Sequence, residues 1–329
     1  MTSNKDLYSW LHGSWSQLAA YLAQQRIPQS LLITGKKGLG KQQLAQNFVK
    51  ALLCEQRSIE SLACGHCSSC QLFNANTHPD FTVIQPEEAG KSITISQIRG
   101  LTDFLLLSSQ FNSYRALIIN DAHRLTHAAA NSFLKSLEEP VEKTCIILIS
   151  DMPTALPATI RSRCQKLFVE APDSEVAKQW LQQQQISEDL DILLNMAHGV
   201  PLTAQQYANE GILASRKSCF NDWLKISRQQ VSPVFIAEQW QKVSDSLILF
   251  WMTTWVTDTL KCYFNQNPDK CYNPDFKPSL QELAQRLELK RLFKFYDLLL
   301  RQKKRLSSQL NKQLIFEEIL INWARLSRK

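Results

Sequence analysis

A glycine-rich stretch, GKKGLGKQ at residues 35–42, constrains the fold of this chain more than any other feature. The apolar run SLLIT comes directly before it, and the segment after it places Leu44, Phe48 and Leu52 at helical spacing. A strand, a glycine loop and a helix in this order form a phosphate-binding loop. The sequence therefore predicts a nucleotide-binding type of α/β domain that begins near the N-terminus.

Further apolar runs extend this pattern along the first half of the chain. They cover residues 81–84, 116–119, 145–149 and 166–169, and helical patterns at 95–107 and 127–140 separate them. Strands that alternate with helices give a parallel sheet with helices on both faces. We therefore expect an α/β domain over residues 1–169.

The pattern changes after the sequence APDS at residues 171–174. Short helical stretches continue to about residue 208, and from 209 onward no strand is predicted. Long helical runs such as 244–260 and 288–310 occupy this last part. We expect a small helical domain at 170–208 and an all-α domain at 209–329.

The glycine loop lacks part of the chemistry of an ATPase. Four residues can still hold phosphate, namely Gly35, Gly38, Gly40 and Lys41. Gln42 stands where a Ser or Thr hydroxyl binds Mg²⁺, and Asn120 and Asp121 stand where an acidic pair would bind the metal and activate water. Two interpretations remain open: a loop that still binds nucleotide, and a glycine turn that serves packing alone.

Four cysteines are clustered in the segment CEQRSIESLACGHCSSC, residues 54–70. Their spacing, C-x9-C-x2-C-x2-C, is typical of a closed structural zinc site, because C-x2-C turns present two thiolates to one ion. The predicted ligands are Cys54, Cys64, Cys67 and Cys70. Reduced thiols without metal are the alternative, and His66 could replace one of the cysteines.

Composition and charge limit the class of protein. The chain is 44% hydrophobic and 20% charged, has no apolar run long enough for a membrane span, and begins without a signal-peptide pattern. We expect a cytoplasmic protein.

Charge is unevenly distributed along the chain. Residues 209–329 hold 20 basic and 12 acidic side chains, a net charge of +8, whereas residues 1–208 hold 17 basic and 18 acidic side chains, a net charge of −1. A basic stretch such as 290–305 fits nucleic acid, an acidic protein partner or solvated helix faces.

Several stretches taken together resemble subunits of the bacterial DNA polymerase III clamp loader, which belong to the AAA+ class. They are GKKGLGK, the four-cysteine insert, THPD at 77–80, NDAHRLTHAAANSFLKSLEEP at 120–140 and TIRSRCQ at 159–165. The resemblance is specific over residues 1–169 and rests on length and helicity beyond. It implies a RecA-like AAA+ domain with a zinc module at 54–70, a helical lid at 170–208 and a helical collar at 209–329.

The resemblance also implies a subunit without ATPase activity of its own. Motor subunits of this family carry an intact phosphate loop, an Asp–Glu pair and an arginine in the lid, where this chain has Leu202. The SRC motif is intact as Ser162, Arg163 and Cys164. By resemblance, Arg163 acts as an arginine finger in the ATP site of a neighbouring subunit, and Arg161 is the alternative.

The implied function is to support ATP-dependent loading of the sliding clamp onto primed DNA. The implied partners are the gamma and tau motor subunits, the delta subunit, the clamp and primer-template DNA; structural zinc is the expected cofactor, and ATP binding by this chain is doubtful. Two rivals are an active AAA+ ATPase and a stand-alone zinc-containing DNA-binding protein.

Overall fold

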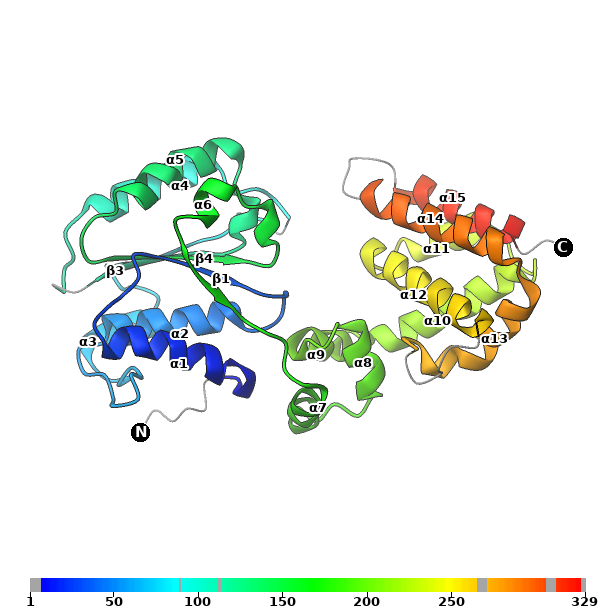
Figure 1. Cartoon of the computed structure of the whole chain (residues 1–329), viewed down its shortest axis with the longest axis horizontal. Coiled ribbons are helices and arrows are strands. Elements are labelled where there is room, and N and C mark those ends of the chain that lie inside the picture. Colours follow the sequence, from blue (N-terminus) through cyan, green and yellow to red (C-terminus); the bar gives the residue numbers. More distant parts are fainter. Residues whose placement is uncertain (1–6, 89, 112–113, 265–270, 306–311, 327–329) are drawn as a thin grey trace. The chain divides into compact units, whose positions relative to one another are not determined.

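The computed structural model describes residues 7–88, 90–111, 114–264, 271–305 and 312–326. The chain divides into two compact units, Met1–Ala177 with Val200–Thr203, and Lys178–Gly199 with Ala204–Lys329 (Figure 1). The expected domain limits at residues 1 and 329 lie outside the described residues. The lid predicted at 170–208 is divided between the two units.

The first unit is built on a five-stranded parallel sheet with the order β2-β3-β4-β1-β5. The strands are β1 (Ser30–Thr34), β2 (Phe81–Ile84), β3 (Arg115–Ile119), β4 (Thr144–Ser150) and β5 (Gln165–Phe168). In register, Thr34 at the end of β1 lies opposite Ser150 at the end of β4. The carboxyl ends of these strands therefore meet at one edge, where α/β sheets bind ligands.

Helices cover both faces of the sheet (Figure 1). One face carries α1 (His12–Ala23), α2 (Lys41–Leu53) and α3 (Ser68–Asn74); the other carries α4 (Ile95–Leu106), α5 (His127–Glu138) and α6 (Ala158–Arg161). Successive residues of a strand point to opposite faces. On β1, Leu31 and Ile33 accordingly pack with α1 and α2, whereas Leu32 packs with the residues of α4 and α5.

Short 3₁₀ turns connect these elements without adding to the layers. They are η2 (Ser9–Leu11), η3 (Ala122–Arg124) and η4 (Pro153–Ala155).

The prediction of a parallel α/β sheet is confirmed: each of the five predicted strands lies within one residue of an observed strand at both ends. Apolar runs bounded by polar residues mark buried parallel strands clearly, because both faces of such a strand are covered.

The second unit contains helices only, within the described residues. They are α7 (Ser174–Gln183), which begins in the first unit, α8 (Leu190–Met196), α9 (Pro201–Asn209), which also bridges the division, α10 (Ile212–Ser227), α11 (Pro233–Trp240), α12 (Asp245–Tyr263), η6 (Pro274–Phe276), α13 (Lys277–Arg286), α14 (Leu289–Arg305) and α15 (Lys312–Leu326). The predicted helix at 288–310 is described as far as Arg305, and residues 306–310 lie outside the described part.

Tryptophans form the centre of this helical core. The rings of Trp223 on α10 and Trp323 on α15 stack with centroids 3.9 Å apart, and Trp323 Nε1 donates a hydrogen bond to the Trp223 carbonyl oxygen at 2.9 Å. Trp251 and Trp255 of α12 are fully buried beside them. Aromatic pairs of this kind add to the stabilisation that burial provides.

A buried polar network fastens the segment before η6 to this core. The Asp258 carboxylate, 0% exposed, accepts hydrogen bonds at 2.8 Å from both the backbone N–H and the side-chain amide of Asn273. Asn273 in turn accepts from Arg216, whose guanidinium forms two contacts with Asp275 at 2.8 and 3.0 Å. Buried polar groups are tolerated when they are paired in this way.

Across the described residues, no helix combines the length and the apolar character that crossing a membrane requires.

Candidate nucleotide loop, metal centre and SRC motif

The glycine loop between β1 and α2 has the backbone conformation of a tight cradle. Gly38 and Gly40 have φ angles of +84° and +83°, a region that side chains other than glycine rarely adopt. A Cβ at Gly40 would lie 2.7 Å from the Tyr8 ring, and one at Gly38 would collide with Thr203. Trp10, which stacks on Tyr8, donates to the Leu39 carbonyl oxygen at 3.0 Å. Neighbouring segments therefore hold the loop in place.

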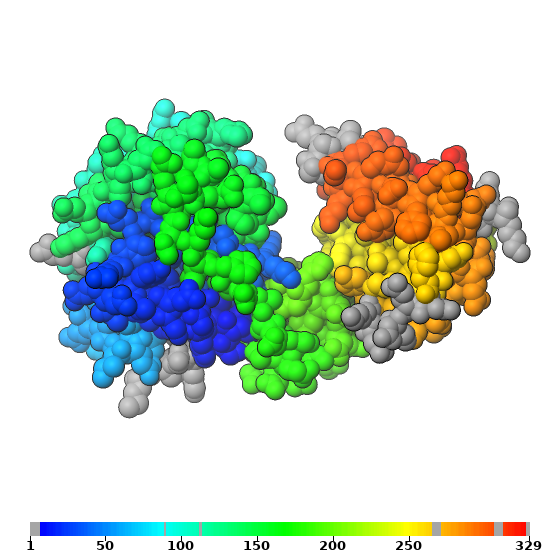
Figure 2. Space-filling model, in the orientation of Figure 1, coloured from blue at the N-terminus to red at the C-terminus, as the bar shows by residue number. Residues whose placement is uncertain are grey.

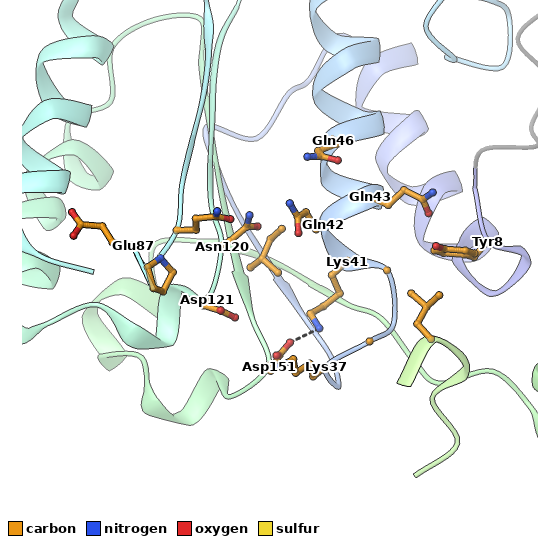
Figure 3. Close-up of a pocket in the computed structure, with 16 residues that line it drawn as sticks. Tyr8, Lys37, Lys41, Gln42, Gln43, Gln46, Glu87, Asn120, Asp121 and Asp151 are labelled. Carbon is orange, nitrogen blue, oxygen red and sulfur yellow. Dashed lines mark hydrogen bonds and ion pairs between the residues drawn. The ribbon is translucent and has the colours of Figure 1, made fainter. Parts of the chain in front are cut away.

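Lys41, the expected phosphate-binding lysine, is buried at the first position of α2. Its Nζ lies 2.5 Å from Asp151 Oδ1 and 2.6 Å from the Lys36 carbonyl oxygen (Figure 3). The side chains of Lys41 and Asp151 are 4% and 20% exposed. Asp151 follows β4 directly, and no pattern in the sequence associates it with the loop.

A cavity of about 720 Å³ opens beside the loop. Its lining includes Lys41, Gln42, Asn120, Asp121 and Leu202, so the structure brings together the residues that the sequence singled out for a degenerate nucleotide site. Figure 3 shows the Gln42 and Asn120 side chains near one another at this cavity. Amide groups occupy the positions at which an ATPase would offer a hydroxyl and a carboxylate to Mg²⁺.

Asn120 is buried with neither polar atom of its side chain hydrogen-bonded, as judged over the described residues. A buried amide of this kind points to water or a ligand in the adjoining cavity.

Asp121 adopts a left-handed conformation with φ of +49°. Burial lowers the pKa of the neighbouring His123, although Asp121 and Asp151 oppose this effect, so its imidazole is neutral near pH 7.

The four cysteines of the insert converge on one point. The Sγ atoms of Cys54, Cys64, Cys67 and Cys70 all lie within 4.8 Å of one another. Two of the Sγ pairs, Cys54–Cys67 and Cys64–Cys70, are 3.9 and 4.0 Å apart. Four thiolates about 2.3 Å from a tetrahedral ion would be about 3.8 Å apart. The cluster therefore has the geometry to hold a metal ion.

Backbone amides surround the same sulfurs. The N–H groups of Cys64, Cys67 and Cys70 donate to the sulfurs of Cys54, Cys64 and Cys67 at 3.3 to 3.4 Å. Burial raises the pKa of Cys54 and Cys70; for Cys64, burial is outweighed by hydrogen bonds from His66 and Cys67, which lower its pKa to about 6. His66 is exposed, and its Nδ1 lies 3.0 Å from the Cys64 carbonyl oxygen, outside the sulfur cluster.

His78, within the THPD stretch, connects the cysteine insert to the sheet. Its Nδ1 accepts a hydrogen bond from the Asp80 backbone at 3.1 Å, so its Nε2 carries the proton that it donates to Ser69 Oγ at 3.0 Å. Ser69 Oγ donates in turn to the Leu53 carbonyl oxygen at 2.8 Å. Burial lowers the His78 pKa, which favours this neutral form. The sequence marked the stretch only by resemblance and did not assign this bridging role.

The SRC motif lies between α6 and β5, in the green segment on the surface of the first unit in Figure 2. Arg163 is exposed; its Nη2 lies 2.6 Å from Glu138 Oε1 at the end of α5, and its Nη1 donates to the Thr159 carbonyl oxygen at 2.9 Å. Ser162 is also exposed, whereas Arg161 is partly buried. Cys164 is buried, which raises its pKa to about 11 and makes it an inert packing residue.

A parallel sheet with a glycine loop and a lysine at its carboxyl edge, together with a helical second unit, defines an α/β protein of the phosphate-loop class. The family profile described as DNA polymerase III, delta subunit matches residues 11–173, and the one described as DNA polymerase III, delta subunit, C terminal matches residues 210–325. Proteins named DNA polymerase III subunit delta' are 30 to 32% identical over nearly the whole chain, so the chain belongs to this family, whose members are components of the clamp loader.

Individual relatives match over nearly the whole chain. DNA polymerase III subunit delta' of Pseudomonas aeruginosa is 32% identical over 98% of this chain and 98% of the relative. The subunit delta' of Yersinia pestis is 30% identical over 96% and 95%. Among solved structures, a DNA polymerase III gamma subunit-related protein of Thermotoga maritima is 18% identical, with a TM-score of 0.47 over 95% of this chain and 99% of that one.

Proposed function

We propose that this chain is a non-hydrolysing subunit of the clamp loader that supports ATP-dependent loading of the sliding clamp onto primed DNA. Its own nucleotide site is inactive, and it serves the ATP site of a neighbouring motor subunit instead. The proposed partners are the gamma and tau motor subunits, the delta subunit, the sliding clamp and primer-template DNA. Family membership supports this assembly, and it also supports the cytoplasmic location that we propose.

One observation carries the proposal that the chain does not hydrolyse ATP. Gln42 and Asn120 line the cavity at the two positions that would bind Mg²⁺ in an ATPase. Neutral amides are poor substitutes for the ligands that Mg²⁺ prefers. Without a positioned metal, charge on the transferring phosphate is not neutralised, and the reaction loses its main source of acceleration. Leu202 in the same cavity offers no charge in compensation.

Arg163 is the proposed arginine finger. Its guanidinium is exposed on the first unit, and the groups that it contacts, the Glu138 carboxylate and the Thr159 carbonyl, lie at the surface. A side chain held by an exposed ion pair can exchange this partner for a phosphate at little cost. Guanidinium suits the task because it remains charged and binds phosphate oxygens in a bidentate manner.

Zinc is the proposed ion of the cysteine cluster. Four cysteines, Cys54, Cys64, Cys67 and Cys70, would hold the ion with no position left for water, so its role is structural.

We further propose the three-domain division into an AAA+ domain at 1–169, a lid at 170–208 and a collar at 209–329. The lid shares its helices with both compact units, which supports a connecting role.

The test uses a reconstituted clamp loader with and without this chain. Clamp loading onto primed DNA should require the chain, and the chain should purify together with the motor subunits. The isolated chain should hydrolyse ATP no faster than buffer. Turnover by the isolated chain would favour an active ATPase, and tight DNA binding by the isolated chain with steep salt dependence would favour a stand-alone DNA-binding protein.

A further inference from the structure

The lysine of the glycine loop already has an anionic partner inside the protein. Lys41 Nζ contacts Asp151 Oδ1 at 2.5 Å and the Lys36 carbonyl oxygen at 2.6 Å, with a side chain that is 4% exposed. In a working phosphate loop, this ammonium group binds the outer phosphates of the nucleotide. The charge that would attract phosphate is therefore neutralised by a carboxylate (Figure 3).

The sheet fixes the position of that carboxylate. Asp151 is the first residue after β4, and β4 pairs with β1 in register up to Ser150 and Thr34. The glycine loop begins one residue after Thr34, so the two strand ends bring Asp151 and the loop together. Both strands are buried throughout, so the carboxylate cannot move away from the loop by more than its own rotamers allow.

We propose that Asp151 is a built-in anion that closes the glycine loop to nucleotide phosphates. An entering phosphate would have to displace the carboxylate from Lys41 and would then remain beside it. Like charges placed side by side in a partly buried site repel each other strongly, so this arrangement disfavours phosphate binding. The inference rests on the proposed function, in which this site is inactive, and it identifies the residue that keeps phosphate out.

The rest of the cavity remains able to receive an anion. The side-chain amide of Asn120 is buried without a hydrogen-bond partner among the described residues, and the loop glycines retain their cradle conformation. An amide N–H can donate to a phosphate oxygen directly, with no metal between them. Removal of the Asp151 charge should therefore create a phosphate site that does not depend on Mg²⁺.

Equilibrium dialysis with ATP, in EDTA and in Mg²⁺, tests the proposal on the full chain. The wild type should show no saturable binding. Asp151→Asn should bind ATP saturably, with a dissociation constant at least about tenfold below the lower limit that the wild-type data set. Its affinity should be equal in EDTA and in Mg²⁺, and Asp151→Asn combined with Lys41→Met should lose this binding. Glu87→Gln is the matched control, because it removes a negative charge from the lining of the same cavity, away from the ion pair of Lys41 and Asp151 (Figure 3).

Two results would overturn the proposal. One is saturable, Lys41-dependent binding of ATP by the wild type. The other is an increase in ATP affinity in Asp151→Asn and Asp151→Ser that is no larger than the increase in Glu87→Gln. Thermal melting checks that each variant is folded. If both Asp151 variants fail to fold, acetylation of the wild type decides: Lys41 should react far more slowly than exposed Lys37, with or without ATP, and equal rates refute the pairing. Clamp loading is not measured here, so failure would leave the proposed function standing.

Discussion

Substitution of Arg163 separates a role in the neighbouring ATP site from a role in folding. The ion pair with Glu138 joins side chains that are 36% and 47% exposed. Exposed pairs contribute about 0–1 kcal/mol to stability, so Arg163→Ala should lower the melting temperature of the first unit by only about 2–4 °C at most. Loss of an arginine finger reduces the rate at the site it serves by about 10³–10⁵, which corresponds to about 4–7 kcal/mol.

The activity of the assembled loader should therefore fall much further than the stability of the subunit. Because this chain is proposed to complete one of several ATP sites, total ATP turnover should fall by a fraction, while clamp loading onto primed DNA should fall severely. Arg163→Lys should behave similarly, since it retains the charge but loses the bidentate fork. Both variants should fold, retain metal and assemble with the motor subunits.

Glu138→Gln is the control that decides the cause. It removes the same ion pair but leaves the guanidinium in place. If Arg163 acts as an arginine finger, clamp loading by this variant should therefore be normal. If Glu138→Gln loads clamps as poorly as Arg163→Ala, the ion pair itself is what matters. If Arg163→Ala assembles normally and loads clamps at the wild-type rate, the assignment is wrong and Arg161 is the next residue to test.

Three further outcomes are expected. Purified protein should contain about one zinc ion per chain by elemental analysis, and Cys67→Ser should release it while the sheet stays folded; full zinc content after Cys67→Ser together with Cys70→Ser would contradict the site. In a phosphate-release assay, the isolated chain should hydrolyse ATP no faster than buffer. Hydrolysis that disappears in Lys41→Ala would instead show that the chain is an active ATPase. Asp258→Ala should leave two Asn273 donors without their acceptor and lower the free energy of unfolding of the second unit, measured in urea, by about 2–6 kcal/mol; a loss below 1 kcal/mol would show that water replaces the carboxylate.

Local patterns in the sequence were sufficient to predict the sheet. Each strand is a short apolar run, and α2 and α5 show helical spacing of buried residues such as Phe48 and Phe133. Convergence of the four cysteines could be predicted as well, because C-x2-C turns allow few arrangements. These features depend on residues close together in the chain.

Contacts between distant segments could not be predicted in this way. Asp151 lies 110 residues after Lys41, and they meet only because β4 is next to β1 in the sheet. Strand order depends on the packing of the whole domain, and neither segment alone contains a sequence pattern that predicts it. The pairing of Arg163 with Glu138 was likewise found only in the structure. The bond from His78 to Ser69 joins residues only nine apart, but no pattern in the sequence specifies how the chain turns between them.

The uneven distribution of tryptophan has an optical consequence. Six of the eight tryptophans fall in the second unit, and two of them form the stacked pair of Trp223 and Trp323. Intrinsic fluorescence and near-ultraviolet circular dichroism will therefore be dominated by the helical core of that unit. In the first unit, Trp10 is hydrogen-bonded to the glycine loop and Trp15 lies on α1. With the other seven tryptophans replaced by phenylalanine, the fluorescence of Trp10 would report whether the loop opens.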